Sequence, residues 1–150
     1  MIPLWRRLIS LDRRRRGLIV EAVALIAIVW TGVRVDRLGT ARRILDIYTS
    51  RPRRIVSGET PAMMIREVSW AVRAVAARLP SATCLVQALA ADAMLRRRRL
   101  RSELRIGVRD RGTASEQFDG HAWVECNGIV AVGRMDDLSE FRILTAPGSR

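Results

Sequence analysis

The chain has 150 residues, of which 49% are hydrophobic and 28% are charged. This length allows one compact domain with its own core, and the composition excludes both an intrinsically disordered chain and a polytopic membrane protein. All 27 basic residues are Arg, and the net charge of +12 predicts attraction to acidic peptides, nucleic acid or anionic lipid headgroups without selecting one of them.

The first 50 residues predict two helices. An apolar stretch at 18–33 contains a single charged residue, Glu21, and arginines flank it. It is shorter than most membrane-spanning helices, so we expect a helix that packs on the core, with association at a membrane surface or a true anchor as alternatives. Apolar residues at helical spacing predict a second helix at 37–48. We therefore expect a helical segment at 1–50 that packs on or extends a core at 51–150.

Two further helices are predicted in the middle of the chain. Thr60 is the expected N-cap of a helix that begins at Pro61, where the missing N–H costs nothing, and Pro80 ends this helix. Its predicted buried stripe is Ile65, Val68, Val72, Val75, Ala76 and Leu79. The next helix is expected to begin near Ser81 or Thr83 and to end near Leu95, where an Arg cluster suits the negative end of the helix dipole.

After residue 100 the apolar pattern changes from helical to alternating. Residues 104–108 alternate in this way and predict a strand that is exposed on one face. Two more strands are expected at 121–126 and 129–132, joined by Asn127-Gly128, the strongest short hairpin signal. A last short strand is predicted at 141–144. Helices followed by an antiparallel sheet indicate an α+β fold.

Cys84 is the candidate nucleophile. It lies in the first turn of a predicted helix, where unpaired N–H groups and the positive end of the dipole stabilise a thiolate. The alternative is a small core side chain. The only other cysteine, Cys126, and the single histidine form no metal-ligand pair with it, so neither metal nor cofactor is predicted. Because no signal-peptide pattern precedes the first charged cluster, we expect a cytoplasmic protein with free thiols.

His121 is the only histidine, so a cysteine mechanism with an imidazole base must use it. Strand alternation places it on one face with Trp123 and places Cys126 on the other face, which favours Cys84 as its partner. Trp123 is expected either to wall a substrate groove or to be a core side chain. Gln87 lies one helical turn after Cys84 and is expected either to line the site or to pack.

A third residue should orient the imidazole by accepting its other N–H. Counting back from the hairpin turn along an unbulged ladder places Asp136 on the face of His121 and Asp137 on the other face. We therefore predict Asp136 as the third residue. A main-chain carbonyl, Asp119 and Asp137 are the alternatives, and a bulge after Val132 would shift the register by one residue.

Three segments together resemble the stand-alone leader peptidases of lasso-peptide biosynthesis. They are Ala82–Leu89 with its C-L-x-Q-A pattern, Leu104–Val108, and Gly120–Glu125 with its H-A-W-V-E pattern. The resemblance covers roughly residues 59–144 and implies a transglutaminase- or papain-like fold with a Cys-His-Asp triad. The acid of that family usually follows the histidine by about a dozen residues, and this chain has Gly133 there.

The resemblance also implies an activity and partners. It implies a cysteine peptidase that removes the leader from a ribosomally made precursor peptide. A separate winged-helix recognition protein would hold the leader, because no such domain fits in this chain, and an ATP-dependent cyclase would then close the macrolactam. Two alternatives are a non-enzymatic basic module that binds nucleic acid or an acidic peptide, and a pseudo-enzyme that chaperones the precursor.

Overall fold

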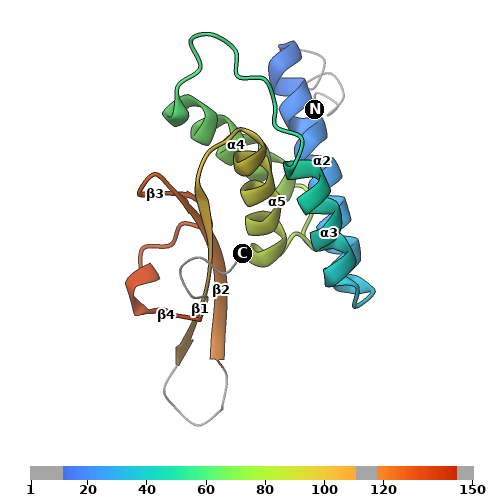
Figure 1. The fold of residues 1–150 in the computed structure, drawn as a ribbon. Coiled ribbons are helices and arrows are strands. Elements are labelled where there is room, and N and C mark those ends of the chain that lie inside the picture. The colour runs from blue at the N-terminus through green and yellow to red at the C-terminus, as the bar shows by residue number, and fades with distance from the viewer. Residues whose placement is uncertain (1–11, 111–117, 145–150) are drawn as a thin grey trace, which may run out of the picture.

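The computed structural model describes residues 12–110 and 118–144, in which four α-helices precede a four-stranded sheet (Figure 1). This arrangement confirms the predicted α+β class. The elements are α2 (Arg13–Arg34), α3 (Leu38–Thr49), α4 (Pro61–Ala76), α5 (Cys84–Arg97), β1 (Ser102–Asp110), β2 (Phe118–Cys126), β3 (Ile129–Val132), the 3-10 turn η1 (Leu138–Glu140) and β4 (Arg142–Ile143).

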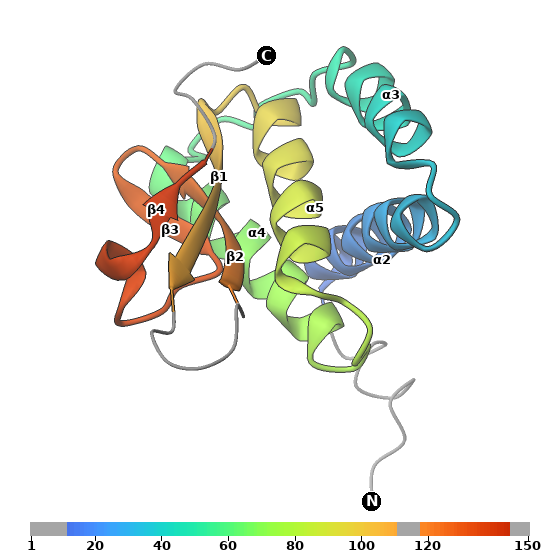
Figure 2. The ribbon, with the colours of Figure 1, turned by 90° about the horizontal axis from the view of Figure 1, so that it is seen from below.

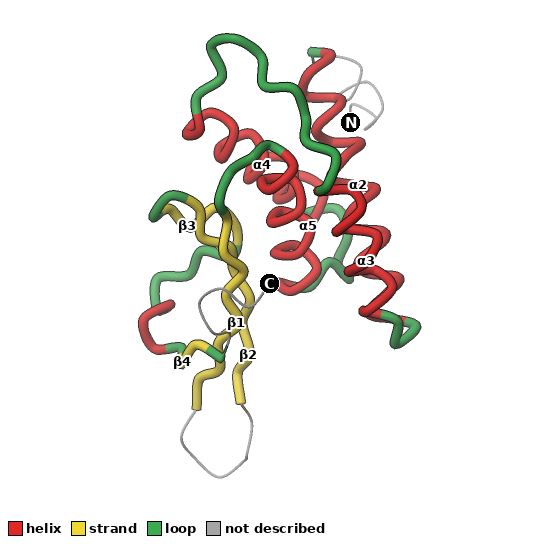
Figure 3. The backbone as a smooth tube through the Cα atoms, viewed as in Figure 1, coloured by secondary structure: helices red, strands yellow, loops and turns green. Residues whose placement is uncertain are grey.

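The helices and the sheet occupy opposite sides of the molecule (Figure 3). The strand order is β3-β2-β1-β4, and every paired strand is antiparallel. Helices α4 and α5 lie against the sheet, and α2 and α3 lie on the side away from the sheet (Figure 2). The main core therefore forms where α5 packs against α2, α4 and β2.

Helix α2 begins at Arg13, earlier than the apolar stretch alone predicts, because Asp12 caps it by accepting a hydrogen bond of 2.8 Å from the Arg15 N–H. Its buried side chains follow one helical stripe: Leu18, Ala22, Leu25, Ile26 and Val29. In the described part of the chain, α2 is the one helix that is long and apolar enough to cross a membrane, and 33% of its apolar window is buried inside the protein.

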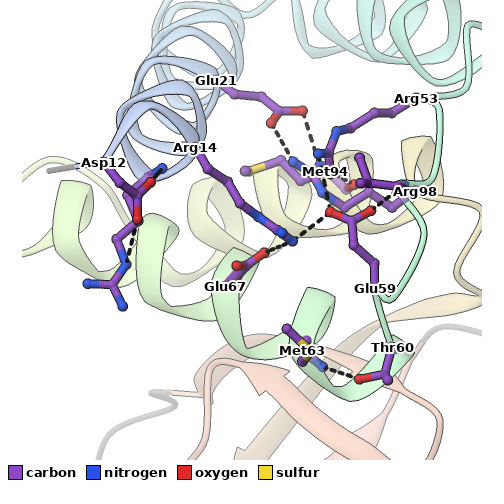
Figure 4. Close-up of polar contacts among 12 residues, drawn as sticks. Asp12, Arg14, Glu21, Arg53, Glu59, Thr60, Met63, Glu67, Met94 and Arg98 are labelled. Atoms are coloured by element: carbon purple, nitrogen blue, oxygen red, sulfur yellow. Dashed lines mark hydrogen bonds and ion pairs between the residues drawn. The ribbon is translucent and has the colours of Figure 1, made fainter.

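Glu21 fastens α2 to the end of α5. Its carboxylate forms a bidentate pair with Arg98, with N–O distances of 2.6 and 3.1 Å (Figure 4). It also accepts a hydrogen bond from the Tyr48 hydroxyl. The Arg98 side chain is 3% exposed and donates a further bond of 2.7 Å to the Met94 carbonyl. Burial alone would raise the pKa of Glu21, but the hydrogen bonds and charge of Arg98, with the Tyr48 hydroxyl, hold it below its ordinary value.

The first turn of α2 is fastened in a similar way. The Arg14 guanidinium lies 2.6 Å from Glu59 in the loop before α4 and 2.7 Å from Glu67 within α4 (Figure 4). Glu59 also pairs with Arg53 at 3.3 Å and accepts a hydrogen bond from the Val56 N–H. Two separate ionic clusters thus join α2 to the rest of the helical layer.

Helix α4 begins as predicted and ends earlier than predicted. The Thr60 hydroxyl accepts a hydrogen bond of 3.3 Å from the Met63 N–H, and Pro61 is the first helical residue. The helix ends at Ala76, and the chain then turns so that the Leu79 N–H reaches the Ala76 carbonyl. Leu79 leaves the helical period there and is 39% exposed, so its predicted place in the buried stripe is wrong.

The hairpin between β2 and β3 has the predicted turn and an unpredicted register. Asn127 and Gly128 have φ angles of 51° and 73°, as a type I′ turn requires. Beyond the turn, Glu125 pairs with Val130 but Val124 pairs with Val132, so Ala131 is an extra residue in β3. The short last strand is confirmed as β4, which pairs with the middle of β1.

Candidate functional site

Cys84 is the first residue of α5. Thr83 precedes it in an extended conformation, and within the described residues the Thr83 hydroxyl makes no capping hydrogen bond to the first turn. The Gln87 side chain donates a hydrogen bond of 2.6 Å to the Ala82 carbonyl and so fixes the turn through which the chain enters the helix. Gln87 therefore packs against the turn that presents Cys84, at the end of the helix where the first N–H groups lack intrahelical acceptors.

The two cysteines lie in different environments. Cys84 is half-buried at the margin of the core, whereas Cys126 is 1% exposed within it. Burial, together with the negative charge of Asp92, raises the pKa of the Cys126 thiol. A raised thiol pKa and the absence of access both suppress reactivity, so Cys84 is the better candidate nucleophile.

His121 is held by a main-chain carbonyl. Its Nε2 lies 2.8 Å from the Gly133 carbonyl oxygen. A carbonyl only accepts hydrogen bonds, so Nε2 carries the proton and Nδ1 presents its lone pair as the basic atom. The imidazole stacks on Trp123 with ring centres 6.0 Å apart and contacts Phe141 at 5.7 Å.

The register that selected Asp136 is wrong. The extra residue Ala131 shifts the pairing, and β3 ends at Val132 before the ladder reaches His121. Asp136 is exposed, and it forms no hydrogen bond or ion pair with another residue of the described ranges. The Gly133 carbonyl instead occupies the orienting position, twelve residues after His121, at the spacing where the resemblance implied an acid.

The alternative acids are engaged by Arg109. Its guanidinium lies 2.9 Å from Asp119 and 2.9 Å from Glu140, and it also pairs with Asp137. The same group lies over the Phe141 ring at 4.7 Å. Arg109 thus fastens the segment around η1 to the strands beside His121. Sequence reasoning missed this role, because it depends on the pairing of 109 with 119, which only the structure shows.

Trp123 belongs to a closed aromatic cluster. It is 2% exposed, and its indole N–H donates a hydrogen bond of 2.8 Å to Glu125. Gly107 lies opposite His121, and a Cβ there would come within 2.9 Å of the Phe141 Cβ and 3.1 Å of the Trp123 ring. The core interpretation of Trp123 therefore fits its position better than an exposed groove wall.

Cys84 and His121 are not joined in this state. Both lie in the described ranges, and no hydrogen bond links them. Along β2 the neighbouring Ala122 packs with the helical core, whereas His121 lies with Trp123 and Phe141. Successive side chains of a strand point to opposite faces, so the imidazole points away from the face that α5 covers.

Comparisons with known proteins identify a family. A family model described as the transglutaminase-like superfamily matches residues 19–146. The match begins within α2 and extends beyond β4, so it includes both the helical layer and the sheet. No curated protein and no solved structure matches the chain. The described residues contain no group of three or more His, Cys, Asp and Glu side chains that could hold a metal ion.

Proposed function

Because this chain belongs to the transglutaminase-like superfamily, which includes cysteine peptidases, we propose that it is a cysteine peptidase with Cys84 as nucleophile and His121 as base. The observation that carries the proposal is the position of Cys84 as the first residue of α5, half-exposed and without a hydroxyl cap among the described residues. The thiol at this position is partly accessible, whereas burial raises the pKa of the second thiol, Cys126, and removes it from solvent.

The proposed reaction is acyl transfer to sulfur followed by hydrolysis. The thiol proton passes to Nδ1 of His121, and the thiolate attacks the scissile carbonyl. N–H groups of the first turn of α5 stabilise the oxyanion. The C–N bond breaks as the imidazolium protonates the leaving amine, and a thioester remains on Cys84. Water then attacks the thioester, gives its proton to Nδ1, and releases the carboxylic acid and the thiol.

This reaction requires Nδ1 of His121 to reach Cys84 when substrate is bound. Because the imidazole lies on the face of β2 that α5 does not cover, substrate binding has to move His121 or the start of α5, which is more than the tightening of a poorly aligned hydrogen bond. The Gly133 carbonyl supports the assignment of the base, because a proton held on Nε2 leaves Nδ1 as the atom with the lone pair in the neutral imidazole. In this proposal the carbonyl takes the orienting role, and the reactive unit is a Cys-His dyad.

We further propose that the substrate is a ribosomally made precursor of a lasso peptide, cleaved in the cytoplasm between leader and core. The C-L-x-Q-A and H-A-W-V-E patterns, in this order and with a strand between them, support this assignment. A separate winged-helix protein would deliver the leader, and an ATP-dependent cyclase would take the released core. The basic surface suits an acidic segment of such a peptide.

The test is cleavage of purified precursor, with and without the recognition protein, followed by mass spectrometry. Cys84→Ala and His121→Ala should abolish cleavage while the far-ultraviolet circular dichroism stays unchanged. Cys126→Ala, which removes the other thiol, is the matched control and should retain activity. Comparable cleavage by Cys84→Ala and the unaltered protein would refute the assignment of the nucleophile. The recognition protein should raise the rate, and an equal rate without it would refute the delivery step.

A non-catalytic precursor chaperone is the second candidate. It is favoured by the separation of Cys84 from His121 and by the exposed position of Asp136. This candidate predicts tight binding of the precursor without cleavage under reducing conditions, and binding that Cys84→Ala leaves unchanged. Any cleavage that depends on Cys84 excludes it.

A further inference from the structure

The outer face of α2 is apolar although it faces solvent. Val20 is 68% exposed and Val23 is 45% exposed, and Ala24 and Ala27 are also exposed. These residues lie opposite the stripe that α2 buries in the core. The solvent-facing strip along α2 therefore carries no charge between its two ends. We name this strip, residues Val20, Val23, Ala24 and Ala27, the outer α2 face.

Helix α3 also carries exposed aliphatic side chains. It packs beside α2 on the side of the molecule away from the sheet (Figures 1 and 2). Ile44 and Ile47 of α3 are 42% and 61% exposed. Exposed aliphatic side chains thus occur on both helices of this pair, and the helices form one outer layer of the protein.

The charge around this layer is positive. Residues 13–49 contain eight Arg and three acidic residues, and one of these acids, Glu21, is directed inward to Arg98. Arg16 precedes the outer α2 face and Arg34 follows it, and both are exposed. An apolar strip with arginines at both ends complements a partner surface that has an apolar interior and negative charges along its outer boundary.

We propose that the outer α2 face and α3 dock this protein on an anionic phospholipid bilayer, with α2 parallel to the membrane plane. The aliphatic side chains enter the boundary between headgroups and acyl chains, and the arginines bind lipid phosphates. The helix does not span the membrane, because its opposite stripe and Glu21 are engaged in the protein core.

The charges disfavour a second copy of the chain as the occupant. If two α2 helices packed through this face in antiparallel order, Arg16 of one would meet Arg34 of the other. In parallel order, each arginine would meet its own equivalent. Both arrangements bring like charges together, which is destabilising, whereas lipid phosphates neutralise them.

The experiment is flotation of the full chain with vesicles of phosphatidylcholine and phosphatidylglycerol, compared with vesicles of phosphatidylcholine alone. The double variant Val20→Glu with Val23→Glu should lower the partition coefficient for the anionic vesicles by at least about tenfold, since two aliphatic contacts are lost. The matched control is Ile129→Glu with Ile143→Glu, at exposed aliphatic positions of the sheet, with the same change in net charge. It should retain binding.

Several results would overturn the proposal. Equal losses in the two double variants would mean that binding depends on net charge alone, and no binding of the unaltered protein to anionic vesicles would exclude a membrane role. A dimer in analytical ultracentrifugation that the α2 variant dissociates would identify a second copy as the occupant. The neutral double variant Val20→Ser with Val23→Ser should also weaken binding, and it tests the apolar contact without altering charge. Circular dichroism checks that each variant is folded.

Discussion

Replacing Gly133 by Ala tests how His121 is oriented. Gly133 has a φ of 84°, and a Cβ there would come within 2.7 Å of the Ala122 carbonyl oxygen and 2.8 Å of the Trp123 Cβ. The substitution therefore strains the backbone and forces it away from β2. Because the Gly133 carbonyl accepts the hydrogen bond from Nε2 of His121, that bond should lengthen or break.

The expected cost has two parts. A left-handed conformation costs an alanine about 1–2 kcal/mol. Overpacking against β2 adds about 1–3 kcal/mol, so Gly133→Ala should lower the free energy of unfolding by about 2–5 kcal/mol. Gly128→Ala is the matched control, because Gly128 has a φ of 73° and no atom within 4 Å of its added Cβ. The Gly128→Ala variant should lose only the free energy that the left-handed conformation costs an alanine.

The assay combines denaturant unfolding with nitrogen-15 NMR of the imidazole. His121 is the only histidine, so its signals are assigned without ambiguity. The unaltered protein and Gly128→Ala should show the proton on Nε2, and Gly133→Ala should lose this preference. A proton on Nδ1 in the unaltered protein would refute the carbonyl assignment. Equal losses in the free energy of unfolding for Gly133→Ala and Gly128→Ala would refute the predicted overpacking of the Gly133 Cβ against β2.

Three other outcomes follow from the described contacts. Glu21→Gln should lower the free energy of unfolding by about 3–5 kcal/mol at neutral pH, because it leaves Arg98 buried without its counter-charge. The pKa of Glu21 is lowered by folding, so its contribution is complete at neutral pH and is lost as the pH falls through that pKa, and the variant's deficit should shrink in acid denaturation curves. Iodoacetamide should label Cys84 well before Cys126 in the folded protein, as mapped by mass spectrometry, and equal rates without denaturant would contradict the burial of Cys126. Arg109→Gln should shift the His121 signals and speed amide exchange in η1, and an unchanged spectrum would show that the η1 segment is held by other contacts.

Local chemistry explains what could be predicted from the sequence. At two places the backbone geometry is determined by adjacent residues. The structure has the predicted helix cap at Thr60 and Pro61 and the predicted turn at Asn127 and Gly128. The position of Cys84 at a helix start follows from its neighbours in the same way. Such features depend on a few adjacent residues, so a single sequence is enough to locate them.

Features that depend on pairing between distant segments were not predictable. The extra residue Ala131 has no local signal, because the apolar run of β3 reads equally well with or without a bulge. The inserted residue invalidates the count that had placed Asp136 beside the imidazole, and the β2–β3 ladder ends at Val132, before Asp136. The role of the Gly133 carbonyl could not be predicted either, since every residue carries a carbonyl and only the fold determines which one lies next to His121. The predicted burial of Leu79 was wrong for a related reason, because α4 ends at Ala76, one turn before the apolar pattern in the sequence ends.

The ionic pair between Glu21 and Arg98 limits how this protein can be divided. A fragment that begins at residue 51 would keep Arg98 at the end of α5 and lose the only carboxylate that the described structure places on it. An uncompensated guanidinium would then open the hydrophobic layer to water, and the fragment would expose the apolar surface that α2 covers. A chimaera that exchanges the first 50 residues between relatives should therefore keep Glu21 together with Arg98. It should also keep the spacing along α2 between Arg14 and Glu21, which hold the two ionic clusters.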